Sequence, residues 1–232
     1  MKDIIVVTSG KGGVGKSTLS GLIGLYLSKN FKVLLIDADL GLTNLELIFN
    51  AIKSKFDISD VIKGRCELYQ AINKIKTNLF LLNLCLSTEV NKYPEYLLES
   101  LIQEVKNDYD YVIVDSPAGI EQGFLNTLTI ATKALIVLNN ELTSFEDARK
   151  TLRVCKMHKI NKIIFAMNKY NKKDTFKSEI YSNFNYYLSN QYLYLIKYCK
   201  GDIYKKQKIL FQDKEFVKMI EKEIKINSLS IV

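Results

Sequence analysis

Seven short apolar runs, separated by segments with helical spacing, constrain the fold of this chain more than any other feature. The runs cover residues 4–7, 33–36, 79–84, 111–114, 135–138, 163–167 and 192–196. Each is apolar without alternation, which is typical of strands buried on both faces. The segments between them space apolar residues three or four apart, as in Leu19, Ile23 and Tyr26. This alternation predicts an α/β fold with a mostly parallel, doubly wound sheet and helices on both faces.

The length and composition of the chain fit one globular domain. Its 232 residues are 47% hydrophobic and 25% charged, with 11 Gly and 2 Pro. These values exclude disordered, collagenous and low-complexity classes. We find no internal repeat and no Pro/Gly/Ser-rich linker, so we expect residues 1–232 to form a single domain.

The charge balance is basic. The chain has 33 Lys+Arg against 25 Asp+Glu, a formal net charge of +8. Two explanations stay open, a basic surface for an anionic partner and a coding bias toward lysine. No basic and apolar leader opens the sequence, and no apolar run approaches the ~18 residues of a membrane span. We expect a cytoplasmic protein with reduced thiols.

A glycine-rich loop follows the first apolar run. Residues 10–17, GKGGVGKS, match the G-x-x-x-x-G-K-[ST] phosphate loop between a strand and a helix. Glycines let the backbone aim N–H groups into a concavity, and the helix N-terminus adds positive potential. The expected nucleotide-binding residues are therefore Gly10, Lys11, Gly12, Gly13, Val14, Gly15, Lys16, Ser17 and Thr18.

Carboxylates follow two of the other runs. Lys16 is placed to contact the β and γ phosphates, and the Ser17 hydroxyl is placed to contact Mg²⁺. Asp115 ends the run at 111–114 and corresponds to the Walker B carboxylate, although an ordinary carboxylate at a strand end is the alternative. With Asp37, which ends another run, the expected metal-site residues are Ser17, Asp37 and Asp115.

Lys11 makes the loop more specific. The segment KGGVGKS resembles the deviant Walker A loop of the MinD/ParA family of dimerising ATPases. That resemblance implies a P-loop NTPase that binds ATP or ADP with Mg²⁺ and forms a homodimer with ATP. It also implies that Lys11 reaches the phosphates of the partner subunit, whereas the alternative is a solvated lysine.

Two further segments carry the resemblance. Residues 37–45, DADLGLTNL, are similar to the family's switch I, which implies that Asp39 orients the attacking water and that Asn44 supports the nucleotide. Residues 115–120, DSPAGI, are similar to switch II as spelled in MinD and in its flagellar relative FlhG. The catalytic residues implied are Lys11, Lys16 and Asp39.

The later motifs leave alternatives. Residues 139–148 resemble the family segment after the next strand, where Ser144 and Asp147 form a helix-capping box or Asp147 contacts a partner. Asn168 matches the family's adenine-reading asparagine, or it caps a turn. Residues 192–198 resemble FlhG more loosely and imply a base pocket, with Lys197 at a position where the family usually has proline.

The C-terminal third offers two candidate surfaces. One helical pattern places Phe216, Met219, Ile220 and Ile224 on one face, which favours a core helix over a membrane anchor because glutamates interrupt its basic face. The tail at 227–232 is too short to supply an anchor. A lysine-rich surface fits either non-specific DNA binding or simple solvation. Its lysines are Lys156, Lys159, Lys162, Lys169, Lys172, Lys173 and Lys177.

These features predict a slow Mg²⁺-dependent ATPase that acts as a dimerising switch for flagellar placement or division-site selection. The expected partners are a second copy, a regulatory protein and a peripheral contact with the inner face of the cell membrane. A DNA-binding partition ATPase is the alternative. An iron-sulfur carrier is disfavoured because Cys66, Cys85, Cys155 and Cys199 are scattered. A small-molecule kinase would leave Lys11 unexplained.

Overall fold

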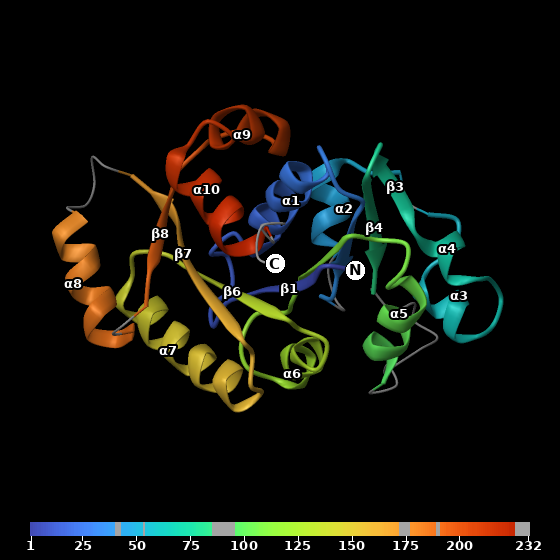
Figure 1. Ribbon diagram of the computed structural model, residues 1–232, viewed down its shortest axis with the longest axis horizontal. Helices are drawn as coiled ribbons and strands as arrows, with labels where there is room; N and C mark the ends of the chain where they lie inside the picture. The colour runs from blue at the N-terminus through green and yellow to red at the C-terminus, as the bar shows by residue number, and fades with distance from the viewer. Residues whose placement is uncertain (40–42, 53, 85–95, 172–176, 189–190, 226–232) are drawn as a thin grey trace, which may run out of the picture.

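Eight strands form one sheet with the order β3-β4-β2-β5-β1-β6-β7-β8 in the computed structural model of the chain (Figure 1). The structure describes residues 1–39, 43–52, 54–84, 96–171, 177–188 and 191–225. The strands are β1 (Asp3–Thr8), β2 (Val33–Asp37), β3 (Asn73–Lys76), β4 (Leu79–Asn83), β5 (Tyr111–Asp115), β6 (Lys133–Leu138), β7 (Lys162–Tyr170) and β8 (Leu193–Lys197). All neighbours pair in parallel except β3 and β4.

The seven predicted strands are confirmed. Their residues are almost entirely buried, as continuous apolar runs in a covered parallel sheet must be. The strand that the sequence analysis did not predict is β3, a short antiparallel edge strand whose residues alternate between half-buried and exposed. Its sequence, NKIK, contains one apolar residue and therefore gives no apolar run.

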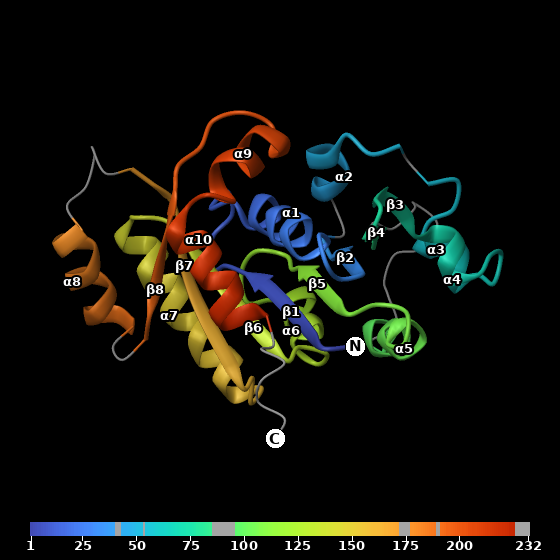
Figure 2. The same cartoon turned by 45° about the horizontal axis from the view of Figure 1, so that its top comes forward.

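Helices cover both faces of the sheet, which confirms the doubly wound prediction (Figures 1 and 2). On one face pack α1 (Lys16–Leu27), α2 (Asn44–Phe49), α9 (Ile203–Leu210) and α10 (Lys214–Met219). On the other pack α3 (Ile58–Ile62), α4 (Leu68–Ala71), α5 (Leu97–Val105), α6 (Gln122–Leu128), α7 (Leu142–Met157) and α8 (Lys177–Leu188). Alternate strand residues divide between the two cores, so that Val7 joins the first and Val6 the second.

The C-terminal helical segment is part of the core, as predicted. Phe216, Met219, Ile220 and Ile224 are all 0% exposed. They lie on α10 and on a π-helical turn, η1 (Ile220–Ile224), that continues it. The tail expected at 227–232 lies outside the described residues. Within the described ranges, none of the helices combines the length and apolarity needed to cross a bilayer.

The strand order brings the polar strand ends together. β1 lies between β5 and β6, so successive connections leave the middle of the sheet toward opposite sides. Asp37 of β2 is the register partner of Asp115 of β5, which is in turn the partner of Val7 of β1. In such sheets ligands bind in the crevice beyond the carboxyl ends of the strands at this switch point. The residues predicted to be functional therefore share one edge of the sheet.

Candidate functional site

The glycine loop turns from β1 into α1 in the way that its sequence predicts. Gly15 precedes the helix with φ 98°, in the left-handed region that favours glycine. A Cβ at Gly15 would lie 2.2 Å from Nδ2 of Asn168, and a Cβ at Gly10 would lie 2.5 Å from Cβ of Asp147. The loop is therefore packed closely against β7 on one side and α7 on the other.

Lys16 begins α1 and lies among three carboxylates. Burial lowers its pKa, and the negative charges of Asp115, Asp39 and Asp37 act in the opposite direction. Ser17, the next residue, hydrogen bonds to Asp115, and Ser20 Oγ donates to Asp115 Oδ1 over 3.1 Å. The structure thus brings the predicted phosphate lysine and the predicted metal-site residues into one cluster.

The two strand-end carboxylates are buried. Burial raises the pKa of Asp37 to about 7 and that of Asp115 to about 6, despite the hydrogen bonds that each accepts. Burial disfavours the charged form of both carboxyl groups, and a bound cation would favour that form, so the pair suits a cation. No group of three or more His, Cys, Asp or Glu within the described ranges could hold a metal ion. Mg²⁺ does not need such a group, because it binds through one or two carboxylates, water and substrate phosphates.

Asp37 also accepts hydrogen bonds from the backbone of the segment that resembles switch I. Its Oδ2 accepts from the backbone N–H of Leu45 over 2.9 Å, and its Oδ1 accepts from that of Asp39 over 3.3 Å. Asn44 Nδ2 donates to Asp39 Oδ2 over 3.4 Å. Residues 40–42 of the predicted switch lie outside the described residues. Asp37 therefore holds both ends of this segment, a role that the sequence motif did not assign to it.

Lys11 lies on the outside of the loop, in a setting unlike that of Lys16. Its Nζ forms a salt bridge with Oε2 of Glu141, and Asn139 Nδ2 donates to Glu141 Oε1 over 2.7 Å. The hydrogen bond from Lys11 holds the pKa of Glu141 below its ordinary value. Both partners of this ion pair are about half exposed, at 43% and 48%. The sequence analysis included Glu141 in the segment 139–148 that resembles the family but assigned no role to it.

The capping box predicted for Ser144 and Asp147 is wrong. α7 begins at Leu142 with Glu141 at its N-cap, so Ser144 lies inside the first turn. Ser144 Oγ instead accepts from the backbone N–H of Asn139 over 3.1 Å. Asp147 packs against Gly10 and pairs with Lys150. The alternative for Asp147, a partner contact, stays a prediction.

Asn168 and the residue that follows it hold the loop from the side of β7. Asn168 Nδ2 donates to the carbonyl of Val14 over 2.9 Å, and Lys169 Nζ donates to that of Gly13 over 2.8 Å. The sequence analysis selected Asn168 but counted Lys169 only among surface lysines. The adjacency of the two residues was the available signal.

Two hollows lie beyond this contact. One, of about 640 Å³, is lined by Lys169, Asn171, Tyr198, Cys199, Lys200, Gly201 and Lys206. A smaller cavity of about 60 Å³ shares four of these residues and reaches Gly15, Thr18 and Asn168. The loop after β8 thus faces the end of β7, where the resemblance implied a base pocket. Lys197 ends β8 and lines the smaller cavity.

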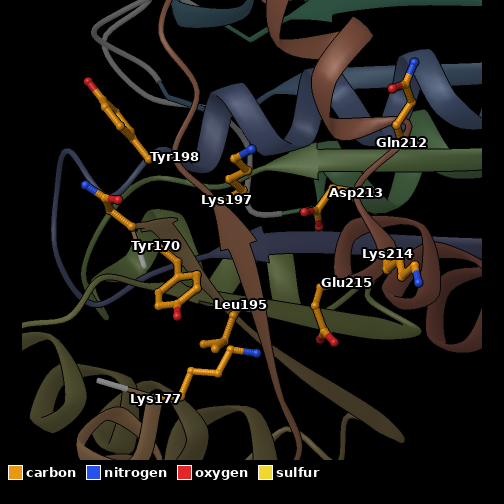
Figure 3. Close-up of a pocket in the computed structure, with 10 residues that line it drawn as sticks. Tyr170, Lys177, Leu195, Lys197, Tyr198, Gln212, Asp213, Lys214 and Glu215 are labelled. Atoms are coloured by element: carbon orange, nitrogen blue, oxygen red, sulfur yellow. The ribbon is translucent and has the colours of Figure 1, made fainter. Parts of the chain in front are cut away.

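A third cavity of about 650 Å³ lies between β8, α8 and the start of α10. Asp213, directly before α10, and Glu215 of α10 line it, and the Lys177 side chain extends toward Glu215 from α8 (Figure 3). Asp213 is already the N-cap of α10, where its side chain accepts from the N–H of Phe216. No residue of the phosphate loop lines this cavity, so it is separate from the cluster around Lys16.

The parallel sheet, the glycine loop before α1 and the buried carboxylate of Asp115 define a P-loop NTPase. The family model for the AAA domain (AAA_31) matches residues 2–173. The chain belongs to this family and, within it, to the MinD/ParA type of deviant Walker A ATPases.

Several of the similar proteins are MinD proteins. The septum site-determining protein MinD of Bacillus subtilis is 37% identical over 158 residues, which are 66% of this chain and 59% of that protein. A chain of the MinC:MinD cell division protein complex of Aquifex aeolicus has a TM-score of 0.78 and 31% identity, covering 97% of this chain and 98% of its own. MinD of Pyrococcus horikoshii with Mg-ADP has a TM-score of 0.73 and 27% identity, covering 85% and 82%. The matched part spans about three fifths of the length of the curated relatives.

Proposed function

We propose that the protein is an ATP-dependent dimerising switch that hydrolyses ATP slowly with Mg²⁺. The observation that carries this proposal is the contrast between two lysines of one loop. Lys16 is surrounded by carboxylates at the start of α1, where it serves the phosphates of its own subunit. Lys11 lies on the rim and pairs with Glu141 in an ion pair whose two side chains are 43% and 48% exposed, so exchange of this contact for the phosphates of a partner subunit would need little rearrangement.

The expected ligands are ATP, ADP and Mg²⁺, because the P. horikoshii MinD structure contains Mg-ADP. The loop residues Gly10 to Thr18 would hold the phosphates, and Ser17, Asp37 and Asp115 would hold the metal ion or its water. When bound, Mg²⁺ neutralises the negative charge that develops on the phosphates. Lys16 adds positive charge at the same place, and Asp115 keeps the Ser17 hydroxyl oriented through their hydrogen bond.

Asp39 is proposed to orient the attacking water. It lies near Lys16, whose pKa its charge affects, and it accepts a hydrogen bond from Asn44. Phosphoryl transfer in such sites depends on positioning and charge stabilisation. The Asp39→Ala variant should therefore lose hydrolysis while keeping the phosphate and metal contacts, and it should accumulate as the ATP-bound dimer.

The test combines a phosphate-release assay with size-exclusion chromatography and light scattering under Mg-ATP and under Mg-ADP. We expect Asp39→Ala to release phosphate at least about 100-fold more slowly than the parent and to elute as a dimer with ATP and as a monomer with ADP. Asp108→Ala, at an exposed aspartate far from the loop, is the matched control and should behave as the parent. An Asp39→Ala protein that stays monomeric with ATP at micromolar concentration would contradict the switch.

The cellular process is proposed to be spatial positioning, with division-site selection favoured over flagellar placement because several similar proteins are named septum site-determining proteins. The Aquifex MinC:MinD complex supports a regulatory protein partner, and the proposed switch would bind this partner in its ATP-bound form. We also propose a cytoplasmic protein with peripheral contact at the membrane. A pull-down with Asp39→Ala, with and without ATP, tests both the partner and its nucleotide dependence.

Non-specific DNA binding is the second candidate function, based on exposed lysines such as Lys156 and Lys159 at the end of α7. Two of the described lysines of the lysine-rich surface already have partners within the protein. Lys162 pairs with Glu223 over 2.8 Å, and Lys169 holds the phosphate loop. Lys172 and Lys173 lie outside the described residues. Salt-sensitive binding to an arbitrary duplex in the presence of ATP would favour this function.

A further inference from the structure

The cavity of about 650 Å³ beside β8 lies at the edge of the sheet, away from the cluster around Lys16. It opens between β8, α8 and the turn that leads into α10 (Figure 3). Its volume is in the range of small-molecule sites. It shares Asn171, Lys197 and Tyr198 with the two hollows next to the phosphate loop, but none of the loop residues 10–18 lines it. A molecule bound in it would therefore be a second ligand rather than part of the nucleotide.

The walls of this cavity are apolar at the bottom and charged at the rim. Tyr170 and Leu195 are 9% and 3% exposed and belong to the core on the side of α7 and α8. Lys177, at the start of α8, is exposed, and Glu215 of α10 is half-buried. Apolar walls with a few polar groups are typical of sites that bind small molecules. The polar groups then decide which ligand fits.

Glu215 contributes an acceptor that lacks a donor. Its Oε2 atom is buried and has no hydrogen-bond partner among the described residues. Lys218, on the same helix, donates instead to Tyr192 Oη over 2.8 Å, and Asp213 already accepts from the N–H of Phe216. A buried carboxylate oxygen without a donor costs free energy, and a positively charged donor offsets this cost better than a neutral one. The cavity is thus suited to a ligand with an ammonium group.

Lys177 places a positive charge opposite this carboxylate. Its side chain extends toward Glu215 from α8 (Figure 3), but it is not a hydrogen-bond partner of the buried Oε2. A ligand that carried only an ammonium group would be repelled by Lys177, and a ligand that carried only an anionic group would be repelled by Glu215. A ligand that carries both charges satisfies both side chains.

We propose that this cavity binds a small zwitterion, an amino acid whose ammonium group contacts Glu215 and whose carboxylate contacts Lys177. The aliphatic part of the ligand lies against Leu195 and the ring of Tyr170, where its burial contributes to the affinity. Because Lys177 belongs to α8 and Glu215 to α10, the ligand joins helices on the two faces of the sheet across its edge strand β8. This site is independent of the proposed binding of ATP.

Three probes that share one aliphatic chain test the charge requirement on the full-length protein. 6-Aminohexanoate carries both charges, hexylamine carries only the ammonium group, and hexanoate carries only the carboxylate. In titrations followed by ligand-observed NMR, we expect 6-aminohexanoate to bind with a Kd of about 1 mM and each of the other probes to bind about tenfold more weakly. Absence of binding by 6-aminohexanoate, or equal binding by a probe with one charge, would overturn the proposal.

A titration in saturating Mg-ADP separates this site from the nucleotide site. Because residues 10–18 do not line the cavity, the affinity for 6-aminohexanoate should stay within about twofold of its value without nucleotide. Competition between Mg-ADP and 6-aminohexanoate would place the probe in the nucleotide site and would overturn the assignment of the cavity.

Two variants test the charged residues. Glu215→Gln keeps the size of the side chain but removes its charge, so 6-aminohexanoate should bind about tenfold more weakly. Lys177→Met removes the repulsion of hexylamine, so hexylamine and 6-aminohexanoate should bind with similar affinity, a change that a merely structural role of Lys177 would not produce. Glu179→Gln, at an exposed glutamate of α8 that does not line the cavity, is the matched control and should bind as the parent does.

The selectivity of Lys177→Met decides the matter if Glu215→Gln does not fold. Parent-like affinity in a folded Glu215→Gln, unchanged selectivity in Lys177→Met, or an equal loss of affinity in Glu179→Gln would each overturn the assignment of these residues.

Discussion

At the scale of single residues, the environment of each loop lysine follows from its position relative to α1. Lys16 is the first residue of the helix, so its side chain lies over the strand ends that carry Asp37 and Asp115. Lys11 precedes the turn and extends outward to Glu141. Exposed ion pairs contribute little to stability, so the Lys11 contact can be exchanged for a phosphate at small cost.

These environments predict different defects for the two lysines. Lys16→Ala should lose a phosphate contact within its own subunit, and ATP binding should fall by about 100-fold or more. Lys11→Ala should keep ATP binding within about threefold of the parent but lose hydrolysis and dimer formation. Binding of a fluorescent ATP analogue at low protein concentration measures the first effect, and phosphate release with light scattering measures the second.

The affinity of the monomer for ATP shows whether Lys11 contacts the phosphates of its own subunit or those of the partner subunit. Lys150→Ala, in which an exposed lysine of α7 is removed, serves as a control for the loss of positive charge near the loop. If Lys11→Ala and Lys16→Ala both abolish nucleotide binding by the monomer, the assignment of Lys11 to the partner's phosphates is wrong.

At the scale of elements, two glutamates tie the C-terminal segment to the sheet face. Tyr26 of α1 donates to Glu221 over 2.8 Å, and Tyr194 of β8 donates to Glu223 over 2.5 Å. Lys162 pairs with Glu223 over 2.8 Å. Burial alone would raise the pKa of Glu223, but its hydrogen bonds with Lys162 and Tyr194 outweigh burial and lower it. The glutamates that interrupt the basic face of this helix therefore have structural partners.

The lowered pKa of Glu223 predicts how acid affects this segment. Its stabilisation is present above the ordinary glutamate pKa, near 4.5, and is lost as pH falls through the lower value in the folded state. Glu223→Gln should cost about 1 kcal/mol at pH 7, and the difference from the parent should shrink below about pH 4. Thermal unfolding over a pH series from 7 downward through 4.5 measures this, with the exposed Glu104→Gln as control. A difference that stays constant at every pH below 4.5 at which the protein still folds would contradict the ionic origin.

The elements differ in how far the sequence reveals them. The seven parallel strands are buried on both faces, so each must be an apolar run, and each was predicted from that run alone. β3 pairs only at an edge and exposes alternate residues, so NKIK carries too little hydrophobicity to be recognised. The short helices α3 and α4 follow capping residues rather than an apolar period, and they too were not predicted.

The residues of the candidate site also differ in whether the sequence alone could predict them. The residues of the loop and the strand ends were identified because their chemistry requires fixed spacing along the chain. Glu141 and Lys169 act through contacts with residues more than 100 positions away, at separations of 130 and 156. Local sequence patterns contain no information on such contacts. The role of Asp37 in holding Leu45 likewise depends on how the segment returns to the sheet.

At the scale of the whole molecule, the edge around the phosphate loop carries exposed apolar side chains. Leu142, next to Glu141 at the start of α7, is 60% exposed, and Ile120, at the end of the segment that resembles switch II, is 44% exposed. The N–H of Gly119 donates to the carbonyl of Ser9, which places Ile120 close to the loop. If two copies face each other across their phosphate loops, these side chains become buried between them.

This arrangement predicts that Leu142→Glu blocks the ATP-dependent dimer without weakening ATP binding by the monomer. Burial of a leucine side chain contributes about 1.5–3 kcal/mol, and a two-fold axis makes each change count twice. A glutamate there would also lie next to Glu141 and repel it, so the dimer should weaken by about 100-fold or more. Light scattering with ATP, on a background of Asp39→Ala to prevent hydrolysis, measures the effect.

The control for this prediction lies on the same helix. Met157, at the other end of α7, is 80% exposed, and Met157→Glu makes a comparable change on a surface away from the loop. It should leave dimer formation as it is in the Asp39→Ala background. Because the two variants share the helix, the background and the added charge, they differ only in their distance from the phosphate loop. Equal dimer formation by both would show that the copies do not meet at this edge of the sheet, even if ATP still drives association elsewhere.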